Sequence, residues 1–118
     1  MSDIRRIYHN DIGIAFQWKQ DIAKNKHNKF QIIFRDTGFY LTLPQIENFA
    51  KLIQQAVSRG CCSACKATNN CRSILLKTPA TIIDLAVSEK ELVSISDLIE
   101  GTLFQIKLDR YLNDVCSN

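Results

Sequence analysis

Residues 30–60, FQIIFRDTGFYLTLPQIENFAKLIQQAVSRG, contain a strand–turn–strand–helix pattern that decides the predicted fold. The run 30–34 is rich in strand-forming residues, and Asp36-Thr37-Gly38 is a turn sequence. Apolar residues then alternate with others over 39–43, so we expect a second strand with one buried face. A proline at the start and apolar residues at helical spacing predict a helix over residues 44–58. The stretch therefore predicts a β-hairpin that leads directly into an amphipathic helix.

The same order of elements recurs 46 residues later. Residues 73–77 and 81–87 are predicted strands, and Ser88 with Glu91 has the spacing of a capping box, which satisfies free amide groups at a helix start. The apolar positions of the two units match at this offset: Leu41, Ile46, Phe49, Leu52 and Ile53 correspond to Val87, Leu92, Ile95, Leu98 and Ile99. This hairpin–helix pseudo-repeat indicates either a degenerate duplication or the common way of covering one face of a sheet, and we favour the second interpretation.

The remaining segments complete the predicted architecture. Residues 4–8 and 12–18 are expected strands, and residues 19–29 are polar enough to be a surface loop. Gly101 indicates an end or a kink of the second helix, and residues 102–115 fit either a helix face or an alternating strand. We predict an α+β fold, an antiparallel sheet of about six strands with two or three helices on one face, that forms a single domain over residues 1–118.

The bulk composition narrows the class of protein. The chain has 118 residues, of which 46 % are apolar, so a core can form without metal or disulfide staples. The net charge of +3 is small, whereas nucleic-acid binders concentrate a stronger basic bias on one face. No apolar run approaches a bilayer span, and the start lacks the apolar stretch of a signal peptide. We therefore expect a cytoplasmic protein with reduced thiols and no membrane partner.

Four cysteines lie close together in the stretch SRGCCSACKATNNCRSILLKTP, residues 58–79. Thiolates are strong zinc ligands, and the turn Cys62-Ser-Ala-Cys65 can place two sulfurs on one ion. Neighbouring side chains of an extended chain point in opposite directions, so Cys61 and Cys62 rarely bind the same metal. The preferred zinc site therefore uses Cys62, Cys65 and Cys71, and its fourth ligand comes from Cys61 or from His9, His27 or Cys116.

Two alternatives to zinc stay open for these cysteines. Cys62 and Cys65 could be a redox dithiol, because Arg59, Lys66 and Arg72 nearby favour the thiolate. The pair follows a helix end, however, where the helix dipole disfavours an anion. The other alternative is that the cysteines are reduced and pack as small apolar residues. The spacing does not match ferredoxin cluster motifs, so we rank an iron–sulfur cluster below zinc.

Signals for catalysis and for nucleic-acid binding are weak. The chain has no glycine-rich phosphate loop, no nucleophile elbow and no His-Glu-x-x-His motif, so we assign no catalytic residue. Lys24, Lys26 and Lys29 form a small basic loop that could contact phosphate, although a solvated loop is the commoner explanation. Nucleic acid is therefore not the expected partner.

The segment CCSACKATNNCRSILLKTPATIIDLAVSEKEL, residues 61–92, resembles a family of small uncharacterised bacterial proteins with a domain of unknown function. The shared pattern is a Cys-x-x-Cys followed by Cys-Arg before a strand that ends in Thr-Pro. The resemblance implies a cytoplasmic protein and transfers no catalytic residue. It draws attention to Cys62, Cys65, Cys71 and Arg72.

Together these observations predict a small, non-catalytic binding protein. Its partner is another protein or a second copy of the chain, because a sheet covered on one side leaves a face or an edge to be covered. Its cysteine segment is held by structural zinc in the leading hypothesis. A thiol-dependent redox or sensor protein using Cys62 and Cys65 is the alternative, and weak nucleic-acid binding is the second alternative.

Overall fold

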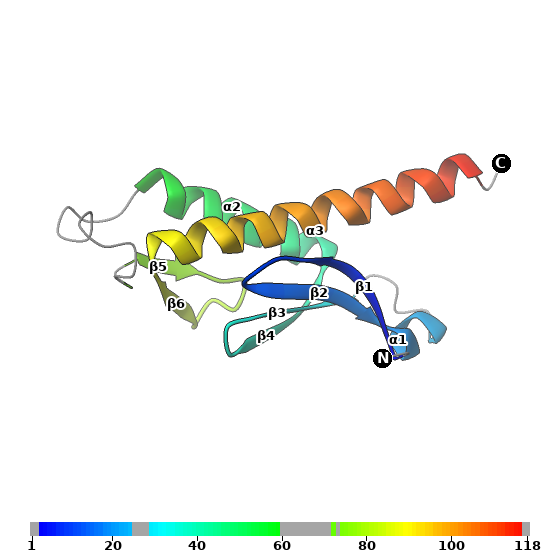
Figure 1. The fold of residues 1–118 in the computed structure, drawn as a ribbon, viewed down its shortest axis with the longest axis horizontal. Helices are drawn as coiled ribbons and strands as arrows, with labels where there is room; N and C mark the ends of the chain where they lie inside the picture. Colours follow the sequence, from blue (N-terminus) through cyan, green and yellow to red (C-terminus); the bar gives the residue numbers. More distant parts are fainter. Residues whose placement is uncertain (1–2, 25–28, 60–71, 73, 117–118) are drawn as a thin grey trace.

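The computed structural model describes residues 3–24, 29–59, 72 and 74–116 (Figure 1). The elements in chain order are β1 (Ile4–His9), β2 (Gly13–Trp18), α1 (Lys19–Ala23), β3 (Lys29–Phe34), β4 (Thr37–Thr42), α2 (Leu43–Arg59), β5 (Ile74–Lys77), β6 (Asp84–Val87) and α3 (Glu89–Cys116). The predicted α+β class is confirmed. The loop predicted over 19–29 instead begins with the short helix α1.

The strands of the described residues form two antiparallel sheets. One has four strands in the order β1-β2-β3-β4, and the other is the hairpin β5-β6. The prediction of about six strands therefore holds, but the strands do not join in one sheet. Instead of pairing with edge strand β4, β6 meets the turn between β3 and β4, where Arg35 Nη1 donates a hydrogen bond to the carbonyl oxygen of Ala86 at 2.9 Å.

The hairpin β3–β4 turns earlier than the sequence suggests. Phe34 pairs with Thr37, so the turn consists of Arg35 and Asp36, and Gly38 already belongs to β4. Arg35 takes the left-handed conformation that such a tight connection requires, with φ of 54°. The predicted turn at 36–38 is therefore displaced by one residue toward the N-terminus. This placement directs Arg35 toward β6 and α3.

Both long helices begin with reciprocal caps. At the start of α2 the Thr42 N–H donates to Gln45 Oε1 at 2.9 Å, and the Gln45 N–H donates to Thr42 Oγ1 at 3.4 Å. At the start of α3 the predicted capping box is confirmed: the Ser88 N–H donates to Glu91 Oε1 at 2.9 Å, and the Glu91 N–H donates to Ser88 Oγ at 3.1 Å.

Helix α3 is longer than the sequence indicates. It continues through Gly101, and residues 102–115 are helical. Of the two predicted alternatives for these residues, the structure therefore has the helix and not the strand. Gly101 is a point of close packing rather than an end, because a Cβ atom there would overlap the ring of Tyr8 from β1. Tyr8 in turn donates a hydrogen bond from its hydroxyl to Asp97 Oδ2 at 2.9 Å. Strand β1 is thereby fastened to the side of α3.

Helices α2 and α3 lie side by side over one face of the four-stranded sheet and over the hairpin β5–β6 (Figure 1). The core between the sheet and α2 contains stacked and tilted aromatic rings from Phe34, Phe39 and Phe49, with centroids 5.5–6.3 Å apart. The orange and red half of α3 extends along the long axis of the molecule, which measures 55 × 26 × 26 Å. Among the described residues, none of the helices combines the length and apolar character of a membrane span.

Candidate binding surfaces around α3

A cavity of about 330 Å³ lies between the inner face of the four-stranded sheet and the C-terminal half of α3. Its apolar wall consists of Ile7, Ile22, Phe30 and Ile106, which come from β1, α1, β3 and α3. The polar groups that line it are Arg5, Gln17, Asp109, Arg110 and Asn113. The cavity therefore combines an apolar body with a polar and charged rim.

The cavity exists because the buried face of α3 changes character along the helix. As far as Ile106 the residues of this face are apolar except for the buried Thr102, but Asp109, Arg110 and Asn113 follow Ile106 at intervals of three, four and seven residues. Residues at this spacing share one helix face. These polar side chains do not pack against the sheet as the apolar ones do, so a space opens beneath them.

Arg5 of β1 connects the sheet side of the cavity with the α3 side. Its Nη1 donates to Gln17 Oε1 and its Nη2 donates to Asp109 Oδ2, both at 2.8 Å. Gln17 is only 4 % exposed, and this contact helps to satisfy its buried amide. Arg110 has no hydrogen-bond or ion-pair partner among the described residues. Because Asp109 balances Arg5, the described residues of the rim carry one excess positive charge, at Arg110.

The opposite face of α3 exposes a second surface, which we call the outer stripe. It consists of Val93, Glu100, Phe104, Lys107 and Tyr111, which recur at intervals of seven, four, three and four residues and so follow one line along the helix. Its three apolar side chains are each 64 % exposed. Leu108 and Leu112 border the stripe and are also exposed. Phe104, Leu108, Tyr111 and Leu112 thus form an exposed apolar cluster, with Val93 apart from it nearer the start of the helix, and such a patch usually marks an interaction site.

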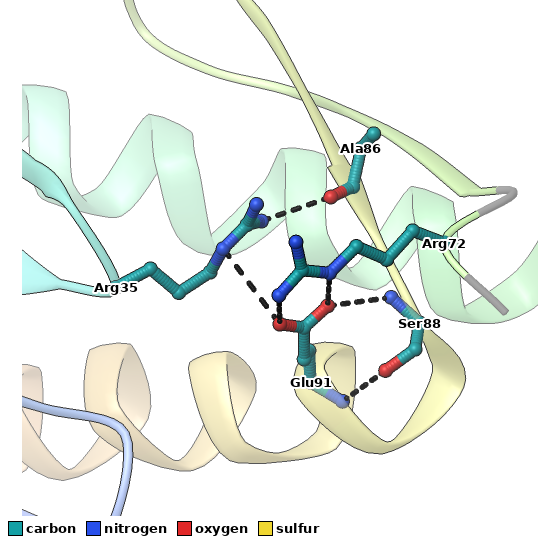
Figure 2. Close-up of polar contacts among 5 residues, drawn as sticks. All are labelled: Arg35, Arg72, Ala86, Ser88 and Glu91. Atoms are coloured by element: carbon teal, nitrogen blue, oxygen red, sulfur yellow. Dashed lines mark hydrogen bonds and ion pairs between the residues drawn. The ribbon is translucent and has the colours of Figure 1, made fainter. Parts of the chain in front are cut away.

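Glu91 forms a polar cluster at the other end of α3 (Figure 2). Arg72 binds its carboxylate with two hydrogen bonds, from Nε at 3.1 Å and from Nη2 at 2.9 Å, and Arg35 Nε lies 3.7 Å from Oε2. The Glu91 side chain is 18 % exposed. One carboxylate thus joins the turn of β3–β4, the residue that follows Cys71 and the start of α3.

The cluster also sets the acidity of Glu91. Burial by itself would raise the pKa of this carboxyl group, but the Ser88 amide, the Arg72 hydrogen bonds and the charges of Arg35 and Arg72 together outweigh burial and lower the pKa below its ordinary value. Glu91 is therefore ionised at neutral pH and holds both guanidinium groups.

The predicted site residues fall largely outside the described part of the chain. Cys61, Cys62, Cys65 and Cys71 lie outside it, and so do Lys26 and His27. Of the other basic residues, Lys24 is exposed after α1, and Lys29 Nζ lies 5.2 Å from the ring centroid of Tyr40. Within residues 3–24, 29–59, 72 and 74–116, no three histidine, cysteine or acidic side chains gather as metal ligands would.

The cavity and the outer stripe were not predicted from the sequence. A signal for the cavity was present in Asp109, Arg110 and Asn113, which continue the buried face of α3 with polar residues. The stripe could not be recognised from the sequence, because it depends on helical spacing and residues 102–115 also fitted a strand. Comparisons with protein-family models, curated proteins and solved structures give no match for this chain. Its function is therefore argued from its own residues.

Proposed function

We propose that this protein is a non-catalytic binding protein that pairs with a second copy of itself, in antiparallel orientation, along the outer stripe of α3. The observation that carries the proposal is the exposure of Val93, Phe104 and Tyr111 on one line of a long helix. Burying a large apolar side chain is worth about 1.5–3 kcal/mol, so three such residues from each copy provide a driving force for association.

The order of residues along the stripe favours a second copy as the occupant. Helix α3 runs from residue 89 to residue 116, so an antiparallel pair that overlaps along its full length places each residue n near residue 205 − n. Val93 then lies opposite Leu112 of the second copy, and Phe104 lies beside the two-fold axis. A closed two-fold contact of this type uses the same surface on both copies.

The charges on the stripe are complementary in the same register. Glu100 of one copy lies about 3 Å along the axis from the level of Lys107 of the other, because the helix rises about 1.5 Å per residue. The contact therefore forms two equivalent ion pairs. Glu100 has no ion-pair partner among the described residues, and Lys107 lies 3.6 Å from Glu47 in an exposed pair that holds it loosely.

Charge reversal tests this pairing. In sedimentation equilibrium the unmodified chain should form a dimer, and Glu100→Lys or Lys107→Glu should each weaken the dimer about tenfold, because two attractive contacts become repulsive. The double variant Glu100→Lys/Lys107→Glu should restore the affinity. Phe104→Glu should give a monomer, since it places two like charges beside the axis.

Val57→Glu is the control, because Val57 is an exposed apolar residue of α2 that lies off the stripe. It should leave the dimer intact. A monomeric unmodified chain, or a double variant that stays as weak as the single ones, would contradict the proposed pairing. Circular dichroism of each variant establishes that the fold is kept.

For the cysteine segment we propose a structural zinc site formed by Cys62, Cys65 and Cys71, with Cys61 or a residue from elsewhere as the fourth ligand. The support is the anchoring of the segment at both ends. Arg59 at the end of α2 donates from Nη2 to the carbonyl oxygen of Leu75 at 3.3 Å, and Arg72 binds Glu91. Both flanks of the segment are thus held on the same body, which is compatible with a closed tetrahedral site whose ligands come from one short segment.

Metal analysis tests the zinc proposal. Protein purified without chelator should contain one zinc ion per chain, and Cys65→Ser and Cys71→Ser should each lose it, because a structural site needs four ligands. Ser63→Ala serves as the control, because it changes a residue of the same segment that is not a candidate ligand. Metal-free protein in which Cys62 and Cys65 show an acidic thiol in pH-dependent alkylation would favour the redox alternative, and ordinary thiol reactivity would favour reduced packing cysteines.

A further inference from the structure

We infer that the cavity beneath α3 binds a small organic monocarboxylate with an apolar body. The cavity lies on the face of α3 that points toward the sheet, whereas the outer stripe lies on the opposite face, so this site is independent of the proposed pairing. Its volume of about 330 Å³ is within the range of sites for small molecules.

The apolar body of the ligand would contact the inner wall. Phe30 and Ile106 are almost completely buried, and Ile7 and Ile22 are half-buried at the sides of the cavity. These four residues come from four different elements, so the wall is preformed by the fold rather than by one flexible segment. Removing apolar surface from water against this wall, mainly at the half-buried Ile7 and Ile22, provides a driving force for binding beside the charge contact at the rim.

The charge of the ligand follows from the rim. Asp109 neutralises Arg5 through a contact of 2.8 Å, whereas Arg110 has no partner among the described residues. Among the described residues the rim therefore has one positive charge to balance, which matches one carboxylate. A guanidinium group also offers parallel N–H donors that fit the two oxygens of a carboxylate, and the Asn113 amide beside it is a further donor.

A set of three ligands with the same apolar body tests the inference. Hexanoate, hexan-1-ol and hexylammonium are titrated into the full chain, and binding is followed by the NMR shifts of backbone amides. Hexanoate should bind with a Kd on the order of 1 mM, as expected for a ligand of this size, and should shift the amides of Gln17, Ile22, Phe30 and Arg110. Hexan-1-ol should bind about tenfold more weakly, and hexylammonium should not bind.

Two matched arginine variants complete the test. Arg110→Gln should weaken hexanoate binding about tenfold and leave hexan-1-ol unchanged, because it removes only the charge contact. Arg6→Gln makes the same change on an exposed residue outside the cavity and should have no effect. Equal binding of hexanoate and hexan-1-ol, an unaffected Arg110→Gln variant, or shifts that map to the outer stripe would overturn the inference, as would the absence of saturable binding.

Discussion

The substitution Gly13→Ala should lower the free energy of unfolding by about 3 kcal/mol, which is a large share of the 5–15 kcal/mol typical of a small domain. A Cβ atom at residue 13 would overlap the carbonyl oxygen of Ile33, and it would lie 2.7 Å from Phe34 Cβ and 3.0 Å from Leu98 Cδ2. Two of these neighbours belong to the paired strand β3, which cannot move aside as the end of a flexible side chain can. The cost is therefore a displacement of β2 relative to β3 and α3.

Urea unfolding followed by circular dichroism measures this loss. The matched control is Gly38→Ala, because a Cβ atom at Gly38 meets only Gln31 Nε2 at 3.2 Å and Ile33 Cγ1 at 3.7 Å, and both are side-chain atoms. We expect that variant to differ from the unmodified chain by less than about 1 kcal/mol. Equal stabilities of the two alanine variants would mean that β2, β3 and α3 are not packed as closely as described here.

The substitution Glu91→Ala should lower the free energy of unfolding by about 2–3 kcal/mol. It removes the half of the capping box in which the Ser88 N–H donates to the Glu91 side chain, whereas the bond from the residue 91 N–H to Ser88 Oγ stays, and it removes the charge-assisted hydrogen bonds to Arg72. It also leaves Arg35 and Arg72 without the carboxylate that they share. Glu91→Gln separates these effects, because glutamine can still complete a capping box. Glu89→Ala removes an exposed acid from the same helix turn and should cost less than about 1 kcal/mol.

The contribution of the Glu91 charge should depend on pH in a defined direction. Because folding lowers the pKa of Glu91 below its ordinary value of 4.5, the folded state binds this proton less readily than the unfolded chain. The stabilisation is fully present above pH 4.5 and is lost as pH falls through the folded pKa. The difference in stability between the unmodified chain and Glu91→Gln should thus be constant near neutral pH and shrink in acid. A difference that grows in acid would contradict the pKa assignment.

Local signals in the sequence were sufficient for the central elements of the fold. The alternation over residues 39–43 and the helical spacing after them predicted β4 and α2 to within two residues of their ends, and the spacing of Ser88 and Glu91 correctly predicted the start of α3. These features depend on neighbours within a few residues, so they can be recognised in a single chain. The order of hairpin and helix also recurs, as β3–β4–α2 and β5–β6–α3. The pseudo-repeat, which we interpret as the common way of covering one face of a sheet rather than as a duplication, stays a prediction.

Features that depend on distant contacts could not be predicted in this way. Gly101 resembled a helix end because glycine usually weakens a helix, but here the absence of a side chain admits the ring of Tyr8, which is remote in sequence. The division of the strands into two sheets depends on Arg35 reaching Ala86. The contact across the rim of the cavity depends on Arg5 and Asp109, which are separated by nearly the whole chain. The two residues of each of these pairs are far apart in the sequence, so no local sequence pattern indicates the contact between them.

The unequal support along α3 has a consequence for hydrogen exchange. As far as Ile106 the helix is held by side chains of the core, so its amides there should exchange only when the whole domain unfolds. Beyond that point the sheet-facing side chains are polar and border a cavity, and those amides can exchange through fraying of the last turns. In this one helix, the amides as far as Ile106 should have exchange protection equal to the global stability. The protection of the amides after Ile106 should increase when a ligand or a second copy binds.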